Sequence, residues 1–464
     1  MEPIGTQRNS MKPGFYTIMA AQFFSSLADN ALLVAAIALL LELSGPAWMV
    51  PMLKFVFVVS YVLLAAWVGA FADSMPKGRV MLVTNTIKIG GCMIMLLYAF
   101  VTPPGIAEYY SVLFAYAVVG FGAAAYSPAK YGILTELLPP EQLVAANGWI
   151  EGTTVGSIIL GTVLGGALVS GTVSAGLLAF DMPLVDTFVD TGPEAAILVI
   201  AVFYAIAAVF NLYIPDTGVD HRIPSRNVAF LIREFSHCVA LLWRDRLGQI
   251  SLATTTLFWG AGATLQFIVL KWAEVALGMN LSQAAILQAV VAVGIAIGAV
   301  VAATKVTLRQ SPSILPVGIA MGFIVIVLAV FNRDVAPDGA IEIALGSRVL
   351  EIPFYVLIAC ALLMLVGGLA GFFVVPMNAL LQHRGHVLMG AGHSIAVQNF
   401  NENLSILAML AVYAWMIRQD LSIMVVILIF GLFVSGAMFL VLMRHRQNQA
   451  QGDSLHLIGM EKPH

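Results

Sequence analysis

Two short stretches place polar side chains inside long apolar runs. The first, SSLADNALL, brings Asp29 and Asn30 into the run Phe15–Leu41. The second, AVQNFNEN, concentrates polar groups within less than two helical turns: Gln398, Asn399, Asn401, Glu402 and Asn403. Gln398 and Asn399 both face Glu402, because residues three or four apart share a helix face. Such side chains can bind a polar or charged ligand, and away from water they require a protein partner or a wet cavity.

Other ionisable residues also interrupt apolar runs. They are Lys54, Lys88, Glu151, Lys271 and Glu274. A charge near the centre of a bilayer costs about 2.5–3.5 kcal/mol on insertion scales, so each group needs a use or a partner. Either these residues form a binding site, or they form internal ion pairs such as Asp29 with Lys88 or Lys130. Lys54, Lys271 and Glu274 lie near the ends of their runs, where long side chains can reach the interface.

The composition indicates which elements position these residues. Of the 464 residues, 60% are hydrophobic and only 10% are charged, and the mean hydropathy is +0.94. Soluble proteins carry about 25% charged residues, so the apolar runs are predicted to be membrane-spanning helices of roughly 20 residues each. The twelve predicted spans are Phe15–Leu41, Pro51–Ala72, Val80–Val101, Tyr109–Pro128, Ala145–Leu168, Ala195–Ile214, Ile250–Leu270, Ala284–Ala303, Leu315–Phe331, Pro353–Val375, Ala391–Met416 and Ile423–Met443.

The spans divide into two sets of six. GAAAYSPAKYGIL in the fourth span and GFFVVPMNALL in the tenth both carry a glycine followed by a proline, which indicates an internal duplication. We therefore predict an all-α membrane protein with two pseudo-symmetric halves, residues 1–214 and 249–443, joined by a linker, residues 215–248, and followed by a tail, residues 444–464. A cavity between the halves is the expected meeting place of the polar stretches.

The linker contains a predicted amphipathic helix with a basic face and an apolar face. The basic face holds Arg226, Arg233, His237 and Arg244, and the apolar face holds Val228, Leu231, Phe235, Val239 and Leu242. This helix either lies at the membrane surface with its basic face toward anionic lipid heads or packs on the bundle as a connection.

Basic residues gather in alternate loops. They are Arg8, Lys12, Lys77, Arg79, Lys130, Arg222, Arg226, Arg233, Arg244, Arg246, Lys305, Arg309, Arg384, Arg444, Arg446 and Lys462. By contrast, the loop Asp181–Glu194 has four acidic residues and no Lys or Arg. The positive-inside rule therefore predicts a multi-pass protein with both termini in the cytoplasm. The loop Asn332–Glu351 fits this pattern less well, because it contains Arg333 and Arg348.

Two motifs point to a fold family. GAFADSMPKGR, residues 69–79, resembles the loop motif between the second and third helices of the major facilitator superfamily. We expect Asp73 and Arg79 to pair across neighbouring helix ends and to act in gating. GTVLGG resembles the antiporter motif of the same superfamily, but Thr162 stands where that motif has proline. Gly161 and Gly165 are instead expected to permit close helix packing.

Longer motifs resemble one family within that superfamily. QFFSSLADNALL, ADSMPKGRVM, AAYSPAKYGIL, AANGWIEGT and NALLQHRGHVLMGAGHSIAVQNFNEN are similar to the bacterial lysophospholipid transporters of the Gram-negative inner membrane. The resemblance implies movement of lysophosphatidylethanolamine, and of related lysophosphatidylglycerol and lysocardiolipin, from the outer to the inner leaflet. An acyltransferase/acyl-carrier-protein synthetase then reacylates these lipids.

The same resemblance suggests residue roles. Asp29, in the Asp-Asn pair with Asn30, is expected to bind the ethanolamine ammonium. Lys130 and the cluster Gln398, Asn399 and Glu402 are expected to surround the rest of the head group, while the acyl tail stays in an apolar, laterally open groove. These groups would replace the hydration of a head that cannot cross about 30 Å of hydrocarbon unaided.

Two rival interpretations stay open. The chain could be a major facilitator exporter or proton symporter of other amphipathic molecules, although helix five lacks the motif proline and helix four lacks the arginine of proton-coupled relatives. It could also be a membrane scaffold that recruits an acyltransferase, although a scaffold needs no wet interior. The sequence has no Walker lysine motif, which predicts no ATP hydrolysis by this chain, and it has neither metal-ligand spacing nor the His-x4-Asp signature of glycerolipid acyltransferases. We expect a protein that is not an enzyme, with no cofactor and no nucleic-acid partner.

Overall fold

The computed structural model describes residues 13–46, 49–179, 189–219, 227–279, 281–345 and 348–452, together with residues 455 and 458. Most of these residues are helical. The α-helices are α1 (Pro13–Glu42), α2 (Met49–Leu63), α3 (Ala65–Ala72), α4 (Lys77–Leu96), α5 (Tyr98–Val101), α6 (Tyr109–Leu137), α7 (Leu143–Leu168), α8 (Gly171–Leu178), α9 (Gly192–Leu212), α10 (Val228–Arg244), α11 (Gly248–Leu277), α12 (Leu281–Lys305), α13 (Leu315–Val330), α14 (Phe354–Met389), α15 (Ala391–Arg418) and α16 (Ile423–Ala450). The remaining elements are two short 3-10 helices, η1 (Pro140–Gln142) and η2 (Leu308–Ile314), and two strands, β1 (Ala340–Leu345) and β2 (Arg348–Pro353).

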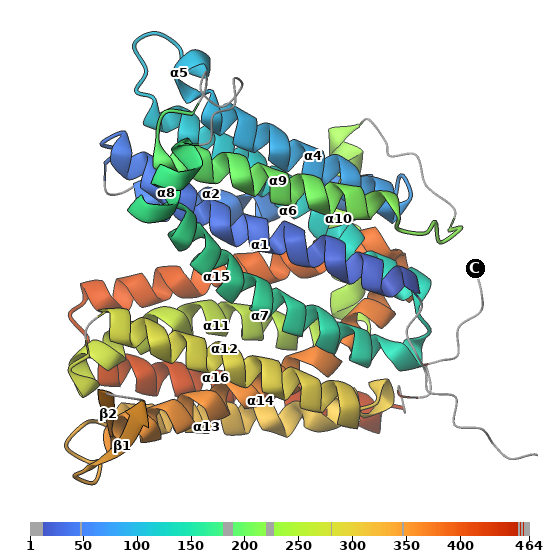
Figure 1. Cartoon of the computed structure of the whole chain (residues 1–464). Helices are drawn as coiled ribbons and strands as arrows, with labels where there is room; N and C mark the ends of the chain where they lie inside the picture. Colours follow the sequence, from blue (N-terminus) through green and yellow to red (C-terminus); the bar gives the residue numbers. More distant parts are fainter. Residues whose placement is uncertain are drawn as a thin grey trace, which may run out of the picture.

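The helices form two bundles that lie side by side, with most axes nearly parallel (Figure 1). We call helices α1–α9 the N half and helices α11–α16 the C half. Several helices connect the halves by packing. In particular, α7 contacts both α1 and α12, and α15 contacts α11 as well as α3 and α6. These helices therefore form much of the seam between the halves.

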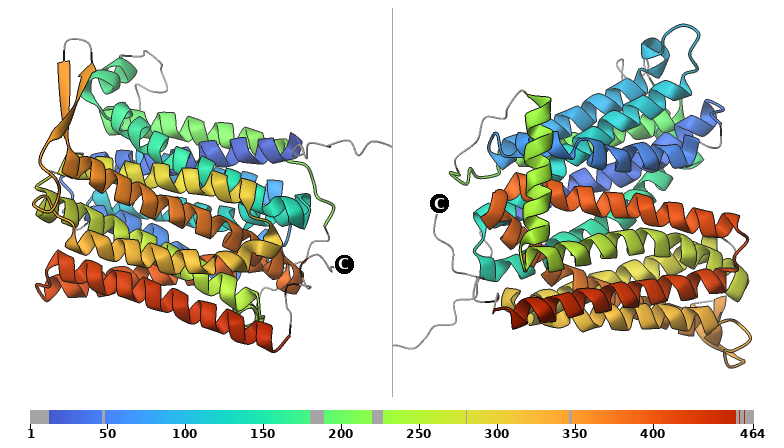
Figure 2. Two further views of the ribbon diagram at one scale, coloured as in Figure 1. Left: turned by 90° about the horizontal axis from the view of Figure 1, so that it is seen from below. Right: turned by 180° about the vertical axis from the view of Figure 1, so that it is seen from behind.

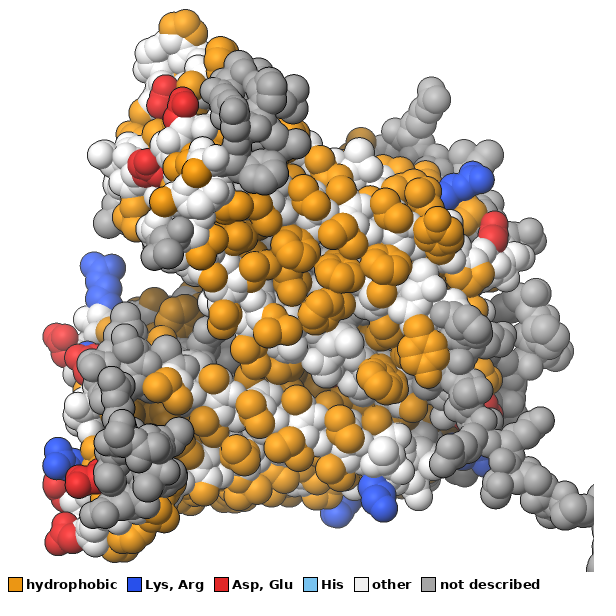
Figure 3. Space-filling view, in the orientation of Figure 1, with side chains coloured by type: hydrophobic (Ala, Val, Ile, Leu, Met, Phe, Trp, Pro, Cys, Tyr) orange, Lys and Arg blue, Asp and Glu red, His pale blue; other side chains and the backbone are white. Residues whose placement is uncertain are grey.

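The number of long apolar helices agrees with the predicted spans. Eleven described helices are long and apolar enough to cross a membrane, and the bent pair α2 and α3 brings the number to twelve. Figure 3 shows apolar side chains covering the visible flank of the bundles, while charged side chains gather toward the two ends. This distribution suits a flank that faces hydrocarbon.

Glycines allow the first and fifth spans to approach closely. A Cβ atom added at Gly161 would lie 2.5 Å from the carbonyl oxygen of Leu27, and one at Gly165 would lie 2.7 Å from that of Ala31. Any larger residue would push α7 away from α1, so the predicted role of these two glycines in close packing is confirmed.

Several predicted boundaries are wrong. The span Pro51–Ala72 is broken by a bend of 64° between Met52–Leu63 and Ala65–Ala72. The spans predicted to end at Pro128 and Val375 continue as α6 to Leu137 and as α14 to Met389, with a proline inside each helix. Neighbouring helices can satisfy the backbone carbonyl that a proline leaves free, so proline does not stop a packed membrane helix.

The linker helix α10 packs on the bundle. Leu231, Phe235, Cys238 and Leu242 are buried, and α10 contacts α3, α11 and α15. In the right view of Figure 2, α10 crosses both halves at a steep angle to the other helices. The basic face stays exposed at Arg233, His237 and Arg244, whereas Arg226 lies outside the described residues.

The two ends of the bundles differ. One, which we call the hairpin end, carries α5, α8 and the antiparallel pair β1–β2, whose register runs from Ala340↔Pro353 to Leu345↔Arg348 (Figure 2). The other, which we call the linker end, carries α10 and the ends of the described helical chain at Pro13 and Ala450. Several charged residues used in the topology prediction lie outside the described residues: Arg8, Lys12, Asp181, Asp186, Arg222 and Lys462.

Candidate functional site

A polar cavity of about 360 Å³ lies between the halves. Its lining comes from helices of both halves, and it includes all six predicted substrate-binding residues: Asp29, Asn30, Lys130, Gln398, Asn399 and Glu402. At the hairpin end, Figure 3 shows a hollow between the two halves. The fold thus gathers polar side chains from distant parts of the chain around one space.

Asp29 is held in an ion pair with Lys88. The Lys88 Nζ donates to both carboxylate oxygens of Asp29 at 2.9 Å and to the Ser25 hydroxyl at 3.0 Å. The Tyr204 hydroxyl also donates to Asp29, at 2.7 Å. Lys88 is 1% exposed and Asp29 is 22% exposed, so the carboxylate stands between the buried ammonium and the cavity. Of the two ion pairs considered from the sequence, the pair with Lys88 is the one that forms.

The polar cluster of α15 is linked into a hydrogen-bonded chain. Gln398 donates to Glu402 at 2.8 Å, as their spacing of four residues predicts, and also to Asn378 of α14 at 3.1 Å. Asn378 donates in turn to Glu151 of α7, at 3.3 Å. Glu151 and Asn378 therefore extend the predicted site. The intramembrane position of Glu151 is a usable sequence signal, whereas nothing in the sequence distinguishes Asn378.

Amide side chains join the two halves. Asn399 of α15 donates to the Ser127 hydroxyl of α6 at 2.9 Å. Asn147 of α7 and Gln382 of α14 form two reciprocal hydrogen bonds of 3.0 Å each. These uncharged contacts hold the seam closed and can separate more readily than ion pairs when the halves move.

Lys130 of α6 lines the same cavity. Its Nζ lies 4.2 Å from the centre of the neighbouring Tyr131 ring. Within the described part of the chain, no ion pair joins Lys130 to a carboxylate. An ammonium in this position can bind an anionic group.

A second, apolar cavity of about 520 Å³ adjoins the polar one. Most of its lining comes from the C half, including Ala261, Ala292 and Phe430, and the rest comes from one face of α7. Ile158 of α7 lines both cavities, so the polar and apolar spaces are adjacent there. Together they can receive a molecule with one polar and one apolar end.

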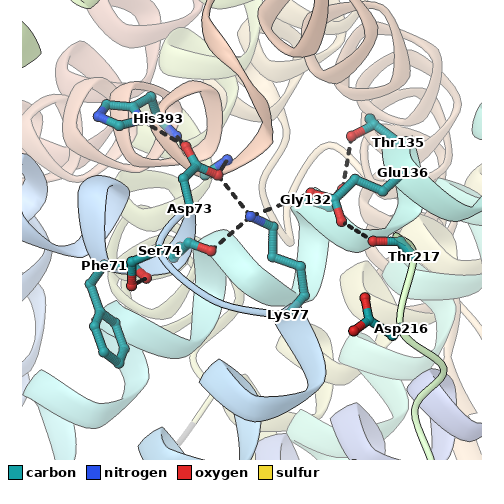
Figure 4. Close-up of polar contacts among 12 residues, drawn as sticks. Phe71, Asp73, Ser74, Lys77, Gly132, Thr135, Glu136, Asp216, Thr217 and His393 are labelled. Atoms are coloured by element: carbon teal, nitrogen blue, oxygen red, sulfur yellow. Dashed lines mark hydrogen bonds and ion pairs between the residues drawn. The ribbon is translucent and has the colours of Figure 1, made fainter. Parts of the chain in front are cut away.

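Asp73 ties the halves together at the linker end (Figure 4). Its carboxylate accepts hydrogen bonds from the backbone N–H groups of Gly392, at 2.7 Å, and His393, at 3.0 Å. The ring Nδ1 of His393 lies 2.7 Å from Asp73, and the Nζ of Lys77 lies 2.7 Å from it. A carboxylate is favoured at the start of α15 by the free N–H groups and the helix dipole.

The predicted pairing of Asp73 with Arg79 is wrong. Lys77, one turn after Asp73, is buried and forms the ion pair, and it also lies 3.3 Å from Glu136. Arg79 is two residues further along α4 and therefore points to the opposite side, where it is exposed. Burial favours the neutral form of Asp73, but hydrogen bonding with His393 and the charge of Lys77 outweigh it and hold the pKa of Asp73 below its usual range.

Two six-span halves around a polar cavity define a membrane transport protein. The model of the Major Facilitator Superfamily matches residues 18–409. The Lysophospholipid transporter LplT of Yersinia enterocolitica is 38% identical over 411 residues, which are 88% of this chain and 89% of the relative. That of Serratia proteamaculans is 40% identical over 402 residues, 86% of this chain and 88% of the relative. The chain belongs to the Major Facilitator Superfamily and, within it, to the family of these LplT transporters, as the sequence motifs predict.

Solved structures support the fold. A bacterial homologue of the iron transporter ferroportin, in its outward-facing state, has a TM-score of 0.66 at 11% identity and covers 95% of this chain and 100% of its own. The E. coli fucose:proton symporter FucP has a TM-score of 0.65 at 11% identity, and the match covers 94% of this chain and 98% of the FucP chain. At these identities the likeness concerns the fold alone.

Proposed function

We propose that this protein moves lysophospholipids, above all lysophosphatidylethanolamine and also lysophosphatidylglycerol, from the outer to the inner leaflet of a bacterial inner membrane. The observation that carries the proposal is that the polar and apolar cavities lie side by side, with Ile158 lining both. A lysophospholipid has one charged head and one acyl tail, so it matches two adjoining spaces of opposite character. The names of the LplT relatives support the same substrate class.

The head group would occupy the polar cavity. Lys130 would bind the phosphate, because it lines the cavity and no carboxylate among the described residues pairs with it. The ammonium of ethanolamine would lie near Asp29 and Glu402, with the amides Gln398 and Asn399 and the neighbouring Asn30 replacing water around the head. Charge-assisted hydrogen bonds of this kind offset the loss of head-group hydration.

The acyl tail would occupy the apolar cavity in the C half. This arrangement keeps the tail out of water at every stage, since the tail moves from hydrocarbon to an apolar wall. It requires binding and conformational change and no covalent chemistry, in keeping with a transport protein.

The structure suggests an access route. The hollow at the hairpin end and the contacts of Asp73 at the linker end favour entry from the hairpin end. We assign the hairpin end to the periplasm and the linker end to the cytoplasm, because Lys77, Arg233 and Arg244 lie on elements at the linker end. The termini would then be cytoplasmic, and residues 1–214 and 249–443 would move as the two rocking units, with residues 215–248 as linker and 444–464 as tail.

Delivery to the inner leaflet places reacylation after transport. A lysophospholipid lacks one acyl chain, so an acyl-transferring enzyme on the cytoplasmic side, of the acyltransferase/acyl-carrier-protein synthetase class, would consume the product. Membrane lipids would be the only other molecules that this mechanism requires.

An uptake assay tests the proposal. Spheroplasts that express the protein are given labelled lysophosphatidylethanolamine, with and without a protonophore. We expect uptake above that of cells without the protein, unchanged by the protonophore, and a reduction of at least tenfold, about 1.4 kcal/mol, in Lys130→Gln at equal abundance. Absence of uptake would overturn the proposal, and uptake abolished by the protonophore would favour a proton symporter.

A further inference from the structure

Lys54 lies near the start of α2, and its side chain lines the polar cavity. It lies on the face of α2 that lines the polar cavity, together with Phe57, Val58 and Tyr61. The spacing of three, four and seven residues is that of one helix face. The side chain of Lys54 is exposed, and it belongs to the wall of the polar cavity that contains Lys130 and Asp29.

The lysines of this cavity differ in their partners. Lys88 is buried and paired with Asp29. Lys54 and Lys130 have no ion pair within the described residues, so neither ammonium is held by direct contact with a protein carboxylate. An ammonium without a protein carboxylate is an available site for an anion.

Lys54 and Lys130 lie at different depths. Lys54 is five residues after Met49, where α2 begins at the hairpin end, and Lys130 is 21 residues after Tyr109, where α6 begins at the same end. The two helices do not begin at the same level, because Phe57 of α2 lies against Gly120 of α6. Lys54 is three residues before Phe57 and Lys130 is ten residues after Gly120, so a rise of 1.5 Å per residue places the two lysines about 20 Å apart along the bundle. The two ammonium groups therefore mark two levels of the cavity, and a phosphate bound at one level must move along the bundle to reach the other.

We propose that Lys54 forms a separate entry site for the phosphate of a lysophospholipid, at the hairpin end of the polar cavity, from which the head group passes to Lys130. This inference rests on the proposed function and adds a second anion site to it. The Asp29–Lys88 pair lies between the two levels, because Lys88 packs against Gly122 of α6, eight residues before Lys130. The pair is internally neutral, so it leaves the phosphate free to move on.

The simplest alternative is that Lys54 only anchors α2 at the membrane interface. Lys271 provides a matched control. It lies six residues before the end of α11 at Leu277, about 9 Å from the hairpin end by helix rise. However, Lys271 is paired with Glu274 at 3.0 Å and does not line the polar cavity. An anchoring role predicts similar effects at both lysines, whereas an entry site predicts an effect at Lys54 alone.

The experiment measures initial uptake against lysophosphatidylethanolamine concentration for wild type, Lys54→Gln, Lys54→Arg and Lys271→Gln, normalised to the amount of protein in the membrane. We expect Lys54→Gln to raise KM about tenfold with less than a twofold change in maximal rate, because the entry contact is lost and the deeper site is kept. Lys54→Arg and Lys271→Gln should stay within twofold of wild type.

A competitor without a phosphate tests whether Lys54 acts on the phosphate or on the tail. Monoacylglycerol carries a tail and a neutral head, so its ability to inhibit uptake should be the same in wild type and Lys54→Gln. The inference is overturned if Lys54→Gln keeps the wild-type KM, if Lys271→Gln raises KM equally, or if Lys54→Gln weakens monoacylglycerol inhibition to the same extent. If the wild type transports no lysophospholipid, the proposed function fails, and the entry site fails with it; a normal wild type with a normal Lys54→Gln removes the entry site alone.

Discussion

In the N half, the lining of the polar cavity carries lysines, the Asp29 carboxylate and several tyrosines, whereas in the C half it carries amides and Glu402. The three lysines in the described lining, Lys54, Lys88 and Lys130, all belong to the N half. The apolar cavity has the reverse distribution, because most of its wall comes from the C half. Two halves of similar architecture thus present different chemistry to one shared space.

This difference indicates a division of roles between the two halves. The N half is suited to recognise a charged head, and the C half is suited to hold a tail and to close around the head with uncharged hydrogen bonds. Changes in the N half should therefore depend on the head group of the substrate, and changes in the C half should depend on its tail.

The largest effect is expected for Asp29→Asn. The change leaves Lys88 buried without its carboxylate, and an unpaired buried charge destabilises a fold by about 3–5 kcal/mol. Uptake should fall at least a hundredfold, which corresponds to a free-energy loss of about 2.7 kcal/mol or more. The measurement is uptake combined with thermal unfolding in detergent.

The double variant Asp29→Asn/Lys88→Gln separates the two roles of Asp29. Removing both charges should restore the unfolding temperature, and uptake should stay low if Asp29 also contacts the ammonium of the substrate. Wild-type uptake by the double variant would show that Asp29 serves only as the partner of Lys88, and the head-recognition role of the N half would then rest on Lys130.

The next effect tests the C half. Ala292→Phe places a large ring in the apolar cavity, so uptake of a long-tailed lysophospholipid should fall about tenfold, a loss of about 1.4 kcal/mol. A short-tailed substrate should be affected less. The adjacent Val293→Phe is the control, because Val293 is exposed and does not line the cavity. Equal losses for both tails would contradict the assignment of the tail to this half.

A smaller effect is expected where the halves meet at the linker end. Asp73→Asn weakens the contacts with Lys77 and His393, so the closed linker end should be populated less, and spin labels at Arg79 and Lys305 should show a broader distance distribution. Transport should change about three- to tenfold, a loss of about 0.7–1.4 kcal/mol, because the amide oxygen of the variant can still accept from the backbone N–H groups of Gly392 and His393. The Asp73 carboxylate of the wild type should not titrate near neutral pH. The lowered pKa of Asp73 keeps the carboxylate charged there, and its contribution is lost only as the pH falls through that lowered value.

Arg79→Gln is the matched control for Asp73→Asn and should have the smallest effect, less than twofold, as is usual for exposed surface residues. A loss equal to that of Asp73→Asn would restore the sequence-based pairing of Asp73 with Arg79.

The architecture could be predicted from the sequence because the apolar composition and the lengths of the apolar runs determine the number of spans. Twelve apolar runs, the superfamily motif and the Asp29 and AVQNFNEN interruptions were sufficient for the fold class and for six residues that share one cavity. The bend near Leu64 was not predictable, since neither proline nor glycine stands at the break.

The directions in which individual side chains point could not be predicted from the sequence. Lys77 and Arg79 are two residues apart in one motif, and only the rotation of α4 decides which of them faces Asp73. Lys54 has the position of an interfacial lysine, and only the register of α2 turns it to the cavity. Asn378 follows Pro376, where the sequence predicts a helix end, so its place in the site depends on α14 continuing through the proline.

The contact between Asp29 and Lys88 also has a consequence for biogenesis. The two residues are 59 positions apart, and ribosomes add about 5–20 residues per second, so α1 is synthesised about 3–12 s before its counter-ion. During that interval α1 has a carboxylate that disfavours the bilayer by about 2.5–3.5 kcal/mol. The first span therefore gains its full affinity for the membrane only when the third arrives, and a single ion pair orders the early assembly of the protein.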